Sequence, residues 1–227
     1  IIDRLIKMPS VDVQWGNHDI VWMAAFSGSP LAMMNVIRIC ARYGNLDILE
    51  ESYGINLRMI LEYAERYYEP SEAFQPRLVD GVRLSDDEKA LLNKLQEATA
   101  ILQFKLESQL IKRRPDFQLE HRDVLHFINF SEKTIKLGTE VYELTDFQAP
   151  TVNPEQPESL TAEEEKIISH LLNNFRSSDK LKRHVEFLQE KGAMYLSYNG
   201  NLLIHGCLPL HENGDFKSFT VNKEAHA

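Results

Sequence analysis

The fold of this 227-residue chain depends most on one stretch, Val11-Asp12-Val13-Gln14-Trp15-Gly16-Asn17-His18-Asp19. Its first five residues alternate apolar and polar side chains between Pro9 and Gly16, which predicts a short strand. Asp19 then opens an apolar helical run that continues to Phe26. A glycine, an amide, an imidazole and a carboxylate therefore stand together where a strand is expected to pass into a helix.

Each residue of the Gly16-Asn17-His18-Asp19 motif can take part in metal or phosphate chemistry. Gly16 allows a tight backbone turn, and Asn17 offers a neutral oxygen to a metal ion. His18 can carry a proton near neutral pH, and Asp19 can accept a hydrogen bond from the imidazole and fix its orientation. The alternative interpretation is a helix N-terminus in which Asn17 or Asp19 caps the backbone and His18 is merely exposed.

A second informative stretch lies near the end of the chain. Asn199-Gly200 separates the apolar runs Met194–Tyr198 and Asn201–His205, which predicts a hairpin, because both turn positions require positive φ. His205 ends the second run and precedes Gly206, so its imidazole is expected at the sheet edge, where a ligand can reach it. A single histidine is more often structural, but its pairing with the first motif favours a functional role.

The sequence between the two motifs is mostly helical. Ser29-Pro30 and Gly44 bound one predicted helix, and apolar spacing from Leu57 to Tyr68 predicts another. The capping boxes Ser85–Glu88 and Thr161–Glu164 begin two more, of which the first runs to Pro115 and is the longest in the chain. A last helix ends at Lys191-Gly192.

Short strands are predicted inside this helical stretch, at residues 126–130, 134–137 and 140–144. Pro150, Pro154 and Pro157 then mark a linker. Glu163-Glu164-Glu165 is interpreted as a solvated first helical turn, favoured by the helix dipole.

Composition limits the classes of protein to consider. Lys and Arg number 25 against 34 Asp and Glu, and the resulting net charge of −9 argues against non-specific binding to nucleic acid or an anionic membrane. The longest apolar run, Ile20 to Phe26, is far shorter than the roughly 20 residues of a membrane span.

Cys40 and Cys207 are expected to be packed thiols. The first residues resemble a helix already in progress, so we expect the chain to begin inside a domain.

The two motifs together resemble those of the calcineurin-like metallophosphoesterases, in which Gly-Asn-His-Asp follows one strand and His-Gly-x-Leu-x-Pro follows a later one. The long helical stretch between them and the run Tyr198–Leu210 are similar, more narrowly, to the class III fructose-1,6-bisphosphatases of bacteria. The resemblance covers the whole chain. It implies an α/β fold: part of a two-sheet sandwich, formed by residues 1–43 and 191–227, interrupted by a mostly helical insertion at 44–190.

The resemblance also implies a site. Asn17 and His205 would be ligands of the same ion in a dinuclear Mn²⁺ centre, His18 would stabilise charge at the scissile phosphate or protonate the leaving alkoxide, and Asp19 would orient His18. The implied reaction is hydrolysis of the 1-phosphate of fructose 1,6-bisphosphate by a hydroxide bridging two ions, in gluconeogenesis in the cytoplasm. Phosphoenolpyruvate activation, AMP inhibition and a homo-oligomer are further expectations; nucleic acid and membrane partners are not expected.

The chain departs from the family pattern in the ligands that it lacks. The Asp-x-His and Gly-Asp-x-x-Asp-Arg-Gly motifs are expected upstream and a further histidine downstream, and His211 and His226 lie too close to His205 to serve. We therefore expect half an active site and an inactive isolated chain. Two alternatives remain: a phosphoprotein or dinucleotide-polyphosphate phosphatase, which the long insertion disfavours, and a non-catalytic helical interaction or regulatory module.

Two basic clusters stand out in this acidic sequence, Arg113-Arg114 and Lys180, Lys182 and Arg183. Either could bind the non-reacting phosphate of a sugar bisphosphate or an allosteric anion. The default interpretation is a solvated helix face in both places.

Overall fold

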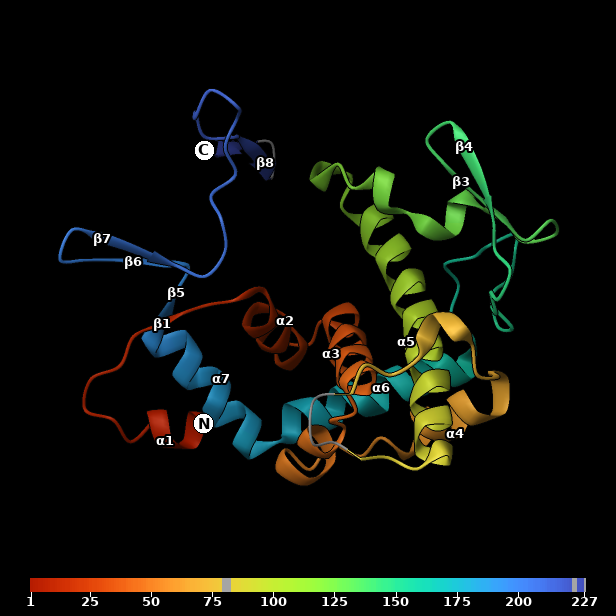
Figure 1. The fold of residues 1–227 in the computed structure, drawn as a ribbon, viewed down its shortest axis with the longest axis horizontal. Coiled ribbons are helices and arrows are strands. Elements are labelled where there is room, and N and C mark those ends of the chain that lie inside the picture. The colour runs from red at the N-terminus through yellow and green to blue at the C-terminus, as the bar shows by residue number, and fades with distance from the viewer. Residues whose placement is uncertain (79–82, 222–223, 227) are drawn as a thin grey trace.

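The computed structural model of the chain describes residues 1–78, 83–221 and 224–226, and its elements are drawn in Figure 1. The helices are α1 (Ile2–Leu5), α2 (Asn17–Phe26), α3 (Pro30–Tyr43), α4 (Arg58–Tyr67), α5 (Asp86–Arg113), α6 (Ala162–Ser177) and α7 (Asp179–Lys191), with the short turns η1 (Ile48–Ser52), η2 (Glu72–Phe74), η3 (Pro115–Phe117), η4 (Glu120–Arg122) and η5 (Val124–Phe127). The strands are β1 (Val13–Gln14), β2 (Ile128–Asn129), β3 (Thr134–Leu137), β4 (Glu140–Glu143), β5 (Gly192–Ala193), β6 (Tyr195–Tyr198), β7 (Asn201–Ile204), β8 (Phe219–Val221) and β9 (Glu224–His226).

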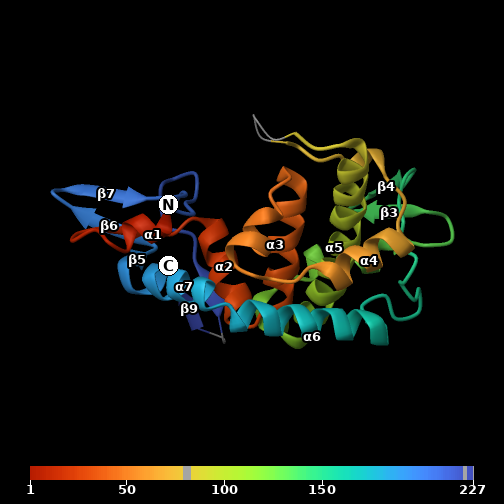
Figure 2. The ribbon, with the colours of Figure 1, turned by 90° about the horizontal axis from the view of Figure 1, so that it is seen from below.

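The helices α2 to α7 form one body with a continuous apolar core. Helices α3 and α4 pack against α5, and α2 packs against α3, α6 and α7 (Figures 1 and 2). Each helix contributes fully or almost fully buried side chains, among them Ala25, Met33, Ile37, Ile60, Leu95, Leu102, Leu171, Phe175 and Val185. Removing a leucine- or phenylalanine-sized side chain from water contributes about 1.5–3 kcal/mol, so this core stabilises the body well beyond the propensity of its separate helices.

The two ends of the helical body meet in a short parallel pair of strands. In the β1–β5 pair, Val13 lies opposite Gly192, and the Trp15 backbone N–H donates to the Ala193 carbonyl at 2.9 Å. The Trp15 indole Nε1 donates to the Leu188 carbonyl at the end of α7, at 2.8 Å. Parallel neighbours require a crossover connection, so the whole helical body is the crossover between β1 and β5.

Gly192 is required for this close approach. A Cβ built on Gly192 would lie 1.9 Å from Trp15 Nε1 and 2.3 Å from the Leu188 carbonyl oxygen. Any side chain here would push the indole off its hydrogen bond and separate the two strands.

A buried ion pair lies at the centre of the helical body. Lys105 Nζ on α5 is 2.8 Å from Glu164 Oε2 on α6, and both side chains are completely inaccessible to solvent. Tyr63 on α4 donates to Glu164 Oε1 at 2.7 Å, and Lys105 also donates to the Thr151 carbonyl at 2.9 Å. Burial raises the pKa of Tyr63 above its usual range, which keeps this phenol a hydrogen-bond donor. The group joins α4, α5, α6 and the segment that precedes α6.

The sequence interpretation of Glu163-Glu164-Glu165 as a solvated turn is wrong for Glu164. The capping box at Thr161 is present, with Glu164 Oε2 accepting from the Thr161 backbone N–H at 2.7 Å. This places the carboxylate on the inner face of α6, where Lys105 compensates its charge. A lysine on the mainly apolar face of a long helix was the signal in the sequence, and its partner could be identified only from the packing.

Helix α5 also holds two loops through polar side chains on its buried face. Asn93 donates to the Ser71 carbonyl and accepts from the Ser71 N–H, at 2.7 and 2.8 Å. The buried Glu97 carboxylate accepts from the backbone N–H and from the side-chain Nε2 of Gln148, each at 3.0 Å. The loops around residues 71 and 148 therefore bind α5 through side chains instead of strand pairing.

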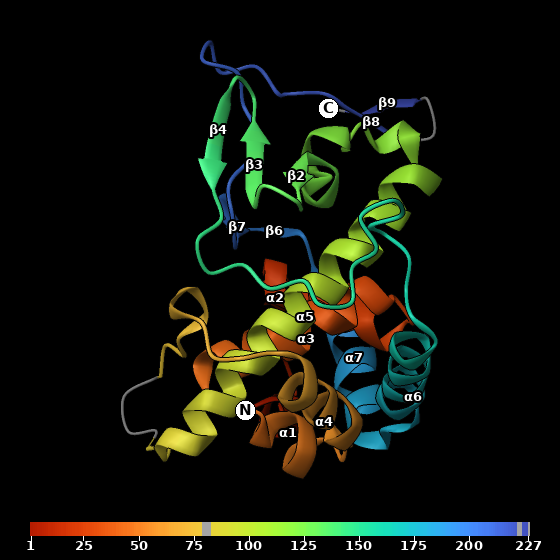
Figure 3. The same cartoon turned by 90° about the vertical axis from the view of Figure 1, so that its right-hand side faces the viewer.

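The predicted helices are confirmed, and most strands are shorter than predicted. Residues 124–127 form the turn η5, so the predicted strand at 126–130 is wrong except for Ile128–Asn129. The antiparallel sheet β2–β3–β4 lies beside the C-terminal half of α5, with η5 between them (Figure 3). The described residues thus form a mixed α/β structure with small sheets.

The hairpin β6–β7 has the predicted turn and very little packing. Asn199 and Gly200 have φ of 50° and 73°, as the Asn-Gly signal requires. The hairpin projects from the helical body (Figure 1), and Tyr198 and Leu202 keep 64% and 53% of their surface exposed. Cys40 is buried as expected, but Cys207 beyond the hairpin is exposed, so the expectation of a packed thiol there is wrong.

We expect Lys105→Met to lower the free energy of unfolding by about 3–5 kcal/mol, because it leaves the Glu164 charge buried and unpaired. Adding Glu164→Gln should restore part of the loss, since glutamine keeps the cap of α6 without a charge. Urea denaturation measures both effects. The matched control is Lys89→Met, whose pair with Asp86 is solvent-exposed and should contribute well under 1 kcal/mol. Equal effects at the two lysines would contradict the buried pair.

The buried Glu97 should make stability depend on pH. Burial raises the pKa of Glu97 from 4.5 to about 7, with no cation in contact within the described residues. The folded state therefore binds this proton more tightly than the unfolded chain, so the contribution to stability is present below about pH 4.5 and is lost as the pH rises to about 7. Relative to Glu97→Gln, the parent should lose unfolding free energy between pH 5 and pH 8 in urea denaturation. The exposed control Glu65→Gln should show no such trend. A difference in unfolding free energy between the parent and Glu97→Gln that stays constant with pH would refute the predicted role of Glu97.

Candidate active site

The Gly16-Asn17-His18-Asp19 motif forms the start of α2, directly after β1. Gly16 is the N-cap residue, and Asn17 and His18 occupy the exposed first turn. The Asp19 carboxylate accepts a hydrogen bond from the Gly16 backbone N–H at 2.8 Å. The capping alternative is therefore confirmed for Asp19: its carboxylate binds a backbone group that the helix leaves unpaired.

His205 lies directly on Gly16. A Cβ built on Gly16 would be 2.8 Å from His205 Cε1 and 2.9 Å from its Nε2, so the imidazole occupies the space that any other residue would fill. The expected reason for the glycine, a tight turn, is wrong, because its backbone is extended, with φ −83° and ψ 168°. The reason is the close approach of His205.

The structure thus brings together two motifs that are 189 positions apart. The pairing of β1 with β5 explains the meeting, since it carries the following hairpin β6–β7, and His205 after it, back to the start of α2. Asn17, the residue after Gly16, therefore has its backbone next to the His205 imidazole. His18 makes no hydrogen bond within the described part of the chain, and the orientation of His18 by Asp19 stays a prediction.

The amide oxygen of Asn17 is a suitable donor for a hard divalent cation such as Mn²⁺, and the imidazole of His205 can bind a range of divalent cations. They are also exposed, as ligands of a substrate-accessible ion would be. Two donors fit part of one coordination sphere and cannot hold a dinuclear centre. In residues 1–78, 83–221 and 224–226 no cluster of three or more His, Cys, Asp and Glu side chains could bind a metal ion.

The other histidines near the end of the chain lie apart from this site. The His211 backbone N–H donates to the Asp215 carbonyl in a turn, and the His226 ring stacks on Phe219 with centroids 5.5 Å apart. That neither histidine supplies the further ligand stays a prediction.

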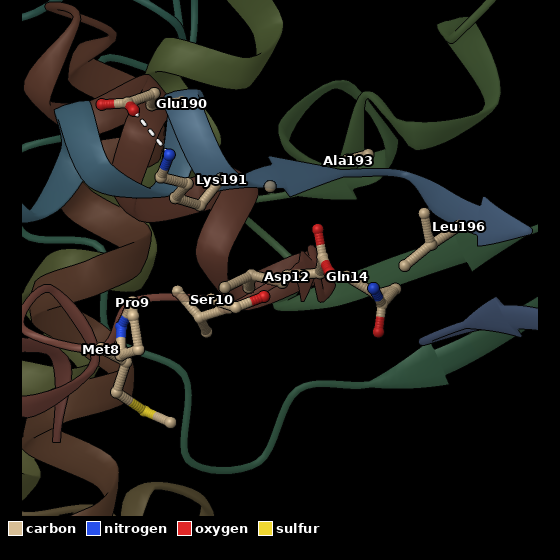
Figure 4. A pocket seen from close by; sticks show the side chains of 12 residues that line it. Met8, Pro9, Ser10, Asp12, Gln14, Glu190, Lys191, Ala193 and Leu196 are labelled. Carbon is tan, nitrogen blue, oxygen red and sulfur yellow. Dashed lines mark ion pairs between the residues drawn. The ribbon is translucent and has the colours of Figure 1, made fainter. Parts of the chain in front are cut away.

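A cleft of about 440 Å³ runs along the β1–β5 pair. Figure 4 shows Met8 to Gln14 on one side and Glu190 to Leu196 on the other, with the Glu190–Lys191 ion pair at its end. The four motif residues do not line it. The cleft is lined by both strands of the β1–β5 pair and is separate from the candidate site.

The basic clusters seen in the sequence have partners on the protein. Lys180 and Arg183 lie 3.7 and 2.9 Å from the Asp3 carboxylate on α1. The hydrogen bond from His184, and after it the one from Arg183, holds the pKa of Asp3 below its usual range. Arg114 pairs with Asp116 at 2.8 Å. Neither cluster lies at the candidate site.

Comparison with known proteins identifies the family. A model described as Firmicute fructose-1,6-bisphosphatase matches residues 1–227, and the chain belongs to this family. A relative from Lactococcus lactis subsp. lactis, named "Fructose-1,6-bisphosphatase class 3", is 99% identical over the whole chain, which covers 36% of that relative. Relatives with the same name from Streptococcus agalactiae and Oceanobacillus iheyensis are 51% and 46% identical over 97% and 100% of the chain, covering 34% and 35% of theirs. The chain thus spans about a third of the length of these relatives, and no solved structure matches it.

Gly16→Ala should displace the His205 imidazole, because the added Cβ would meet the ring at 2.8 Å. NMR of the His205 ring, through the chemical shifts of its carbon-bound protons, measures the displacement. Gly206→Ala is the matched control, since a Cβ there meets nothing within 4 Å. An unchanged His205 spectrum in the Gly16→Ala variant would show that the contact does not hold the imidazole.

Proposed function

We propose that this chain supplies part of the active site of a metal-dependent phosphomonoester hydrolase, which converts fructose 1,6-bisphosphate to fructose 6-phosphate and phosphate in gluconeogenesis. The observation that carries the proposal is the 99% identity of all 227 residues to a relative named "Fructose-1,6-bisphosphatase class 3". The contact of His205 with Gly16 supports it, because it joins the two motifs on which the site depends.

In this proposal each motif residue has one role. Asn17 and His205 hold a Mn²⁺ ion, and a divalent pair would supply charge neutralisation and an activated nucleophile. His18, exposed on the first turn of α2, stabilises charge on the transferring phosphoryl group or protonates the leaving alkoxide. Asp19 fixes the turn that carries His18 through its bond to Gly16.

The proposed core is a two-sheet sandwich built from residues 1–43 and 191–227, with residues 44–190 as the insertion. The exposed apolar residues of the hairpin support this assignment, since a strand pair with Leu202, Leu203 and Ile204 in water is not stable by itself. Relatives about three times as long as the chain have further segments that could cover the hairpin and supply the missing ligands. Helix α3 packs on α5, so the first core segment and the insertion share one apolar core.

The remaining expectations belong to the same proposal. They are the cytoplasm as location, Mn²⁺ as the preferred ion, phosphoenolpyruvate and AMP as effectors, and a homo-oligomer. Within the described residues, no helix is both long enough and apolar enough to cross a membrane. The non-catalytic alternative has one observation in its favour: the part of the chain that the structure describes has no group of three or more His, Cys, Asp and Glu side chains that could hold a metal ion.

The test is phosphate release with Mn²⁺ from fructose 1,6-bisphosphate and from a phosphopeptide, by this chain and by the full-length Lactococcus lactis relative. We expect the relative to act on the sugar alone and the 227-residue chain to be inactive. In the relative, replacing the residue equivalent to His18 by alanine should lower turnover by about 10²–10⁴-fold while metal content stays near normal. Replacing the equivalent of His205 should instead lose bound metal.

A surface histidine provides the control. His121→Ala should change neither turnover nor metal content, since the exposed His121 lies on η4, outside the two motifs. Loss of metal in the His18 variant with an unchanged rate per bound ion would reverse the two assignments. Activity on the phosphopeptide but not on the sugar would favour the phosphoprotein phosphatase alternative.

A further inference from the structure

Two arginines on α3 have no carboxylate partner among the described residues. Arg38 and Arg42 are four residues apart, and thus neighbours on one face of the helix. The guanidinium of Arg38 donates to two neutral amides, through Nε to Gln103 Oε1 at 2.9 Å and through Nη2 to Asn35 Oδ1 at 3.2 Å. Arg42 Nε is buried and has no hydrogen-bond partner in the part of the chain that the structure describes.

The surroundings do not neutralise this pair. Burial and the charge of Arg42 lower the pKa of Arg38, and the charge of Glu107 on α5 offsets part of this shift. Glu107 is itself half-buried and lies 3.7 Å from the guanidinium of Arg122. Within the described residues neither Arg38 nor Arg42 forms an ion pair, although Asp and Glu outnumber Lys and Arg by 34 to 25 in the chain.

The Arg42 backbone has a partner on another segment. Its carbonyl accepts a hydrogen bond from the Arg77 N–H at 2.7 Å, so the segment after η2 runs beside the end of α3. Arg38 is held by Asn35 and Gln103. The Arg38 guanidinium is thus held in place, and the unpaired buried N–H of Arg42 is costly unless a ligand accepts from it.

We propose that Arg38 and Arg42 form a binding site for a phosphate group, free or carried on a small molecule. Two guanidinium groups match the two negative charges and several acceptor oxygens of a phosphate, and the planar fork of arginine binds such oxygens in pairs. A carboxylate offers one charge and two oxygens, and leaves the second arginine uncompensated.

This site is distinct from the candidate active site. Arg38 and Arg42 lie in the C-terminal half of α3, against α5, whereas Asn17 and His18 begin α2 and His205 follows β7. It needs no metal ion, and it does not rest on the proposed function.

The test is a titration with inorganic phosphate in the absence of metal, followed by calorimetry and by the melting temperature, with sodium chloride at matched ionic strength as reference. It is carried out on the full-length Lactococcus lactis relative and on this chain. We expect phosphate to raise the melting temperature more than chloride does. Arg38→Gln and Arg42→Gln should each weaken phosphate binding by about tenfold or more, since each removes a charged hydrogen-bond donor.

Three controls make the result specific. Arg58→Gln removes an exposed arginine that pairs with Glu62, and should leave phosphate binding unchanged. Arg38→Lys keeps the charge but not the fork, and should bind phosphate more weakly than the parent; it also serves if the glutamine variants fail to fold. Without phosphate and at low salt, Arg42→Gln should melt at a higher temperature than the parent, because it relieves like-charge repulsion.

The proposal is overturned if phosphate stabilises the protein no more than chloride, or if Arg38→Gln and Arg42→Gln bind phosphate as the parent does. Loss of phosphate binding in the His18→Ala variant alone would overturn it too, because the phosphate would then be at the motif site. Glycerol 3-phosphate is the second probe: tighter binding than inorganic phosphate assigns a phosphate monoester, and equal binding assigns free phosphate.

Discussion

The helical body is organised around a charged pair that water does not reach. Burying either Lys105 or Glu164 alone would cost several kcal/mol, so the two must meet and their other hydrogen-bonding groups must be satisfied. Tyr63 and Thr151 complete the group, and both bind Glu164 Oε1, at 2.7 and 2.6 Å. Apolar contacts between helices tolerate small shifts, whereas these distances do not. The ion pair therefore selects one arrangement of α4, α5 and α6 among the many that would bury similar area.

A second constraint fixes the ends of that body. Two parallel strands can be neighbours only if the chain between them returns to the same edge, and here the returning chain is the helical body itself. Trp15 bonded to Leu188, with Gly192 leaving space for the indole, joins the start of this crossover to its end. The position of His205 against Gly16 depends on that closure. The body of helices thus determines how two short motifs meet, and its first helix, α2, begins with three residues of the first motif.

The sequence correctly predicted those features that depend on residues close to one another in the chain. The capping boxes at Ser85 and Thr161 and the Asn199-Gly200 turn depend on neighbours within four residues, and all are present. The burial of Glu164 and the reason for Gly16 depend on residues 59 and 189 positions away, so no local pattern could give them. The meeting of His205 with the first motif was predicted only through resemblance to a family. The predicted strand at 126–130 was too long because residues 124–127 form a helical turn. A short apolar run of this kind is compatible with either a helical turn or a strand.

The contrast between Lys105 and the two arginines of α3 shows that the position of a cation in the fold determines whether it meets a carboxylate. All three are cations on helices that pack together, in a chain with nine more acidic than basic residues, so a shortage of carboxylates explains nothing. Lys105 faces the start of α6, where the capping box already presents a carboxylate inward. Arg38 faces Gln103 on α5, one turn before Glu107, and Glu107 lies 3.7 Å from the guanidinium of Arg122. The interior thus neutralises the cation that it seals from water, and within the described residues it leaves the two half-buried arginines without an ion pair.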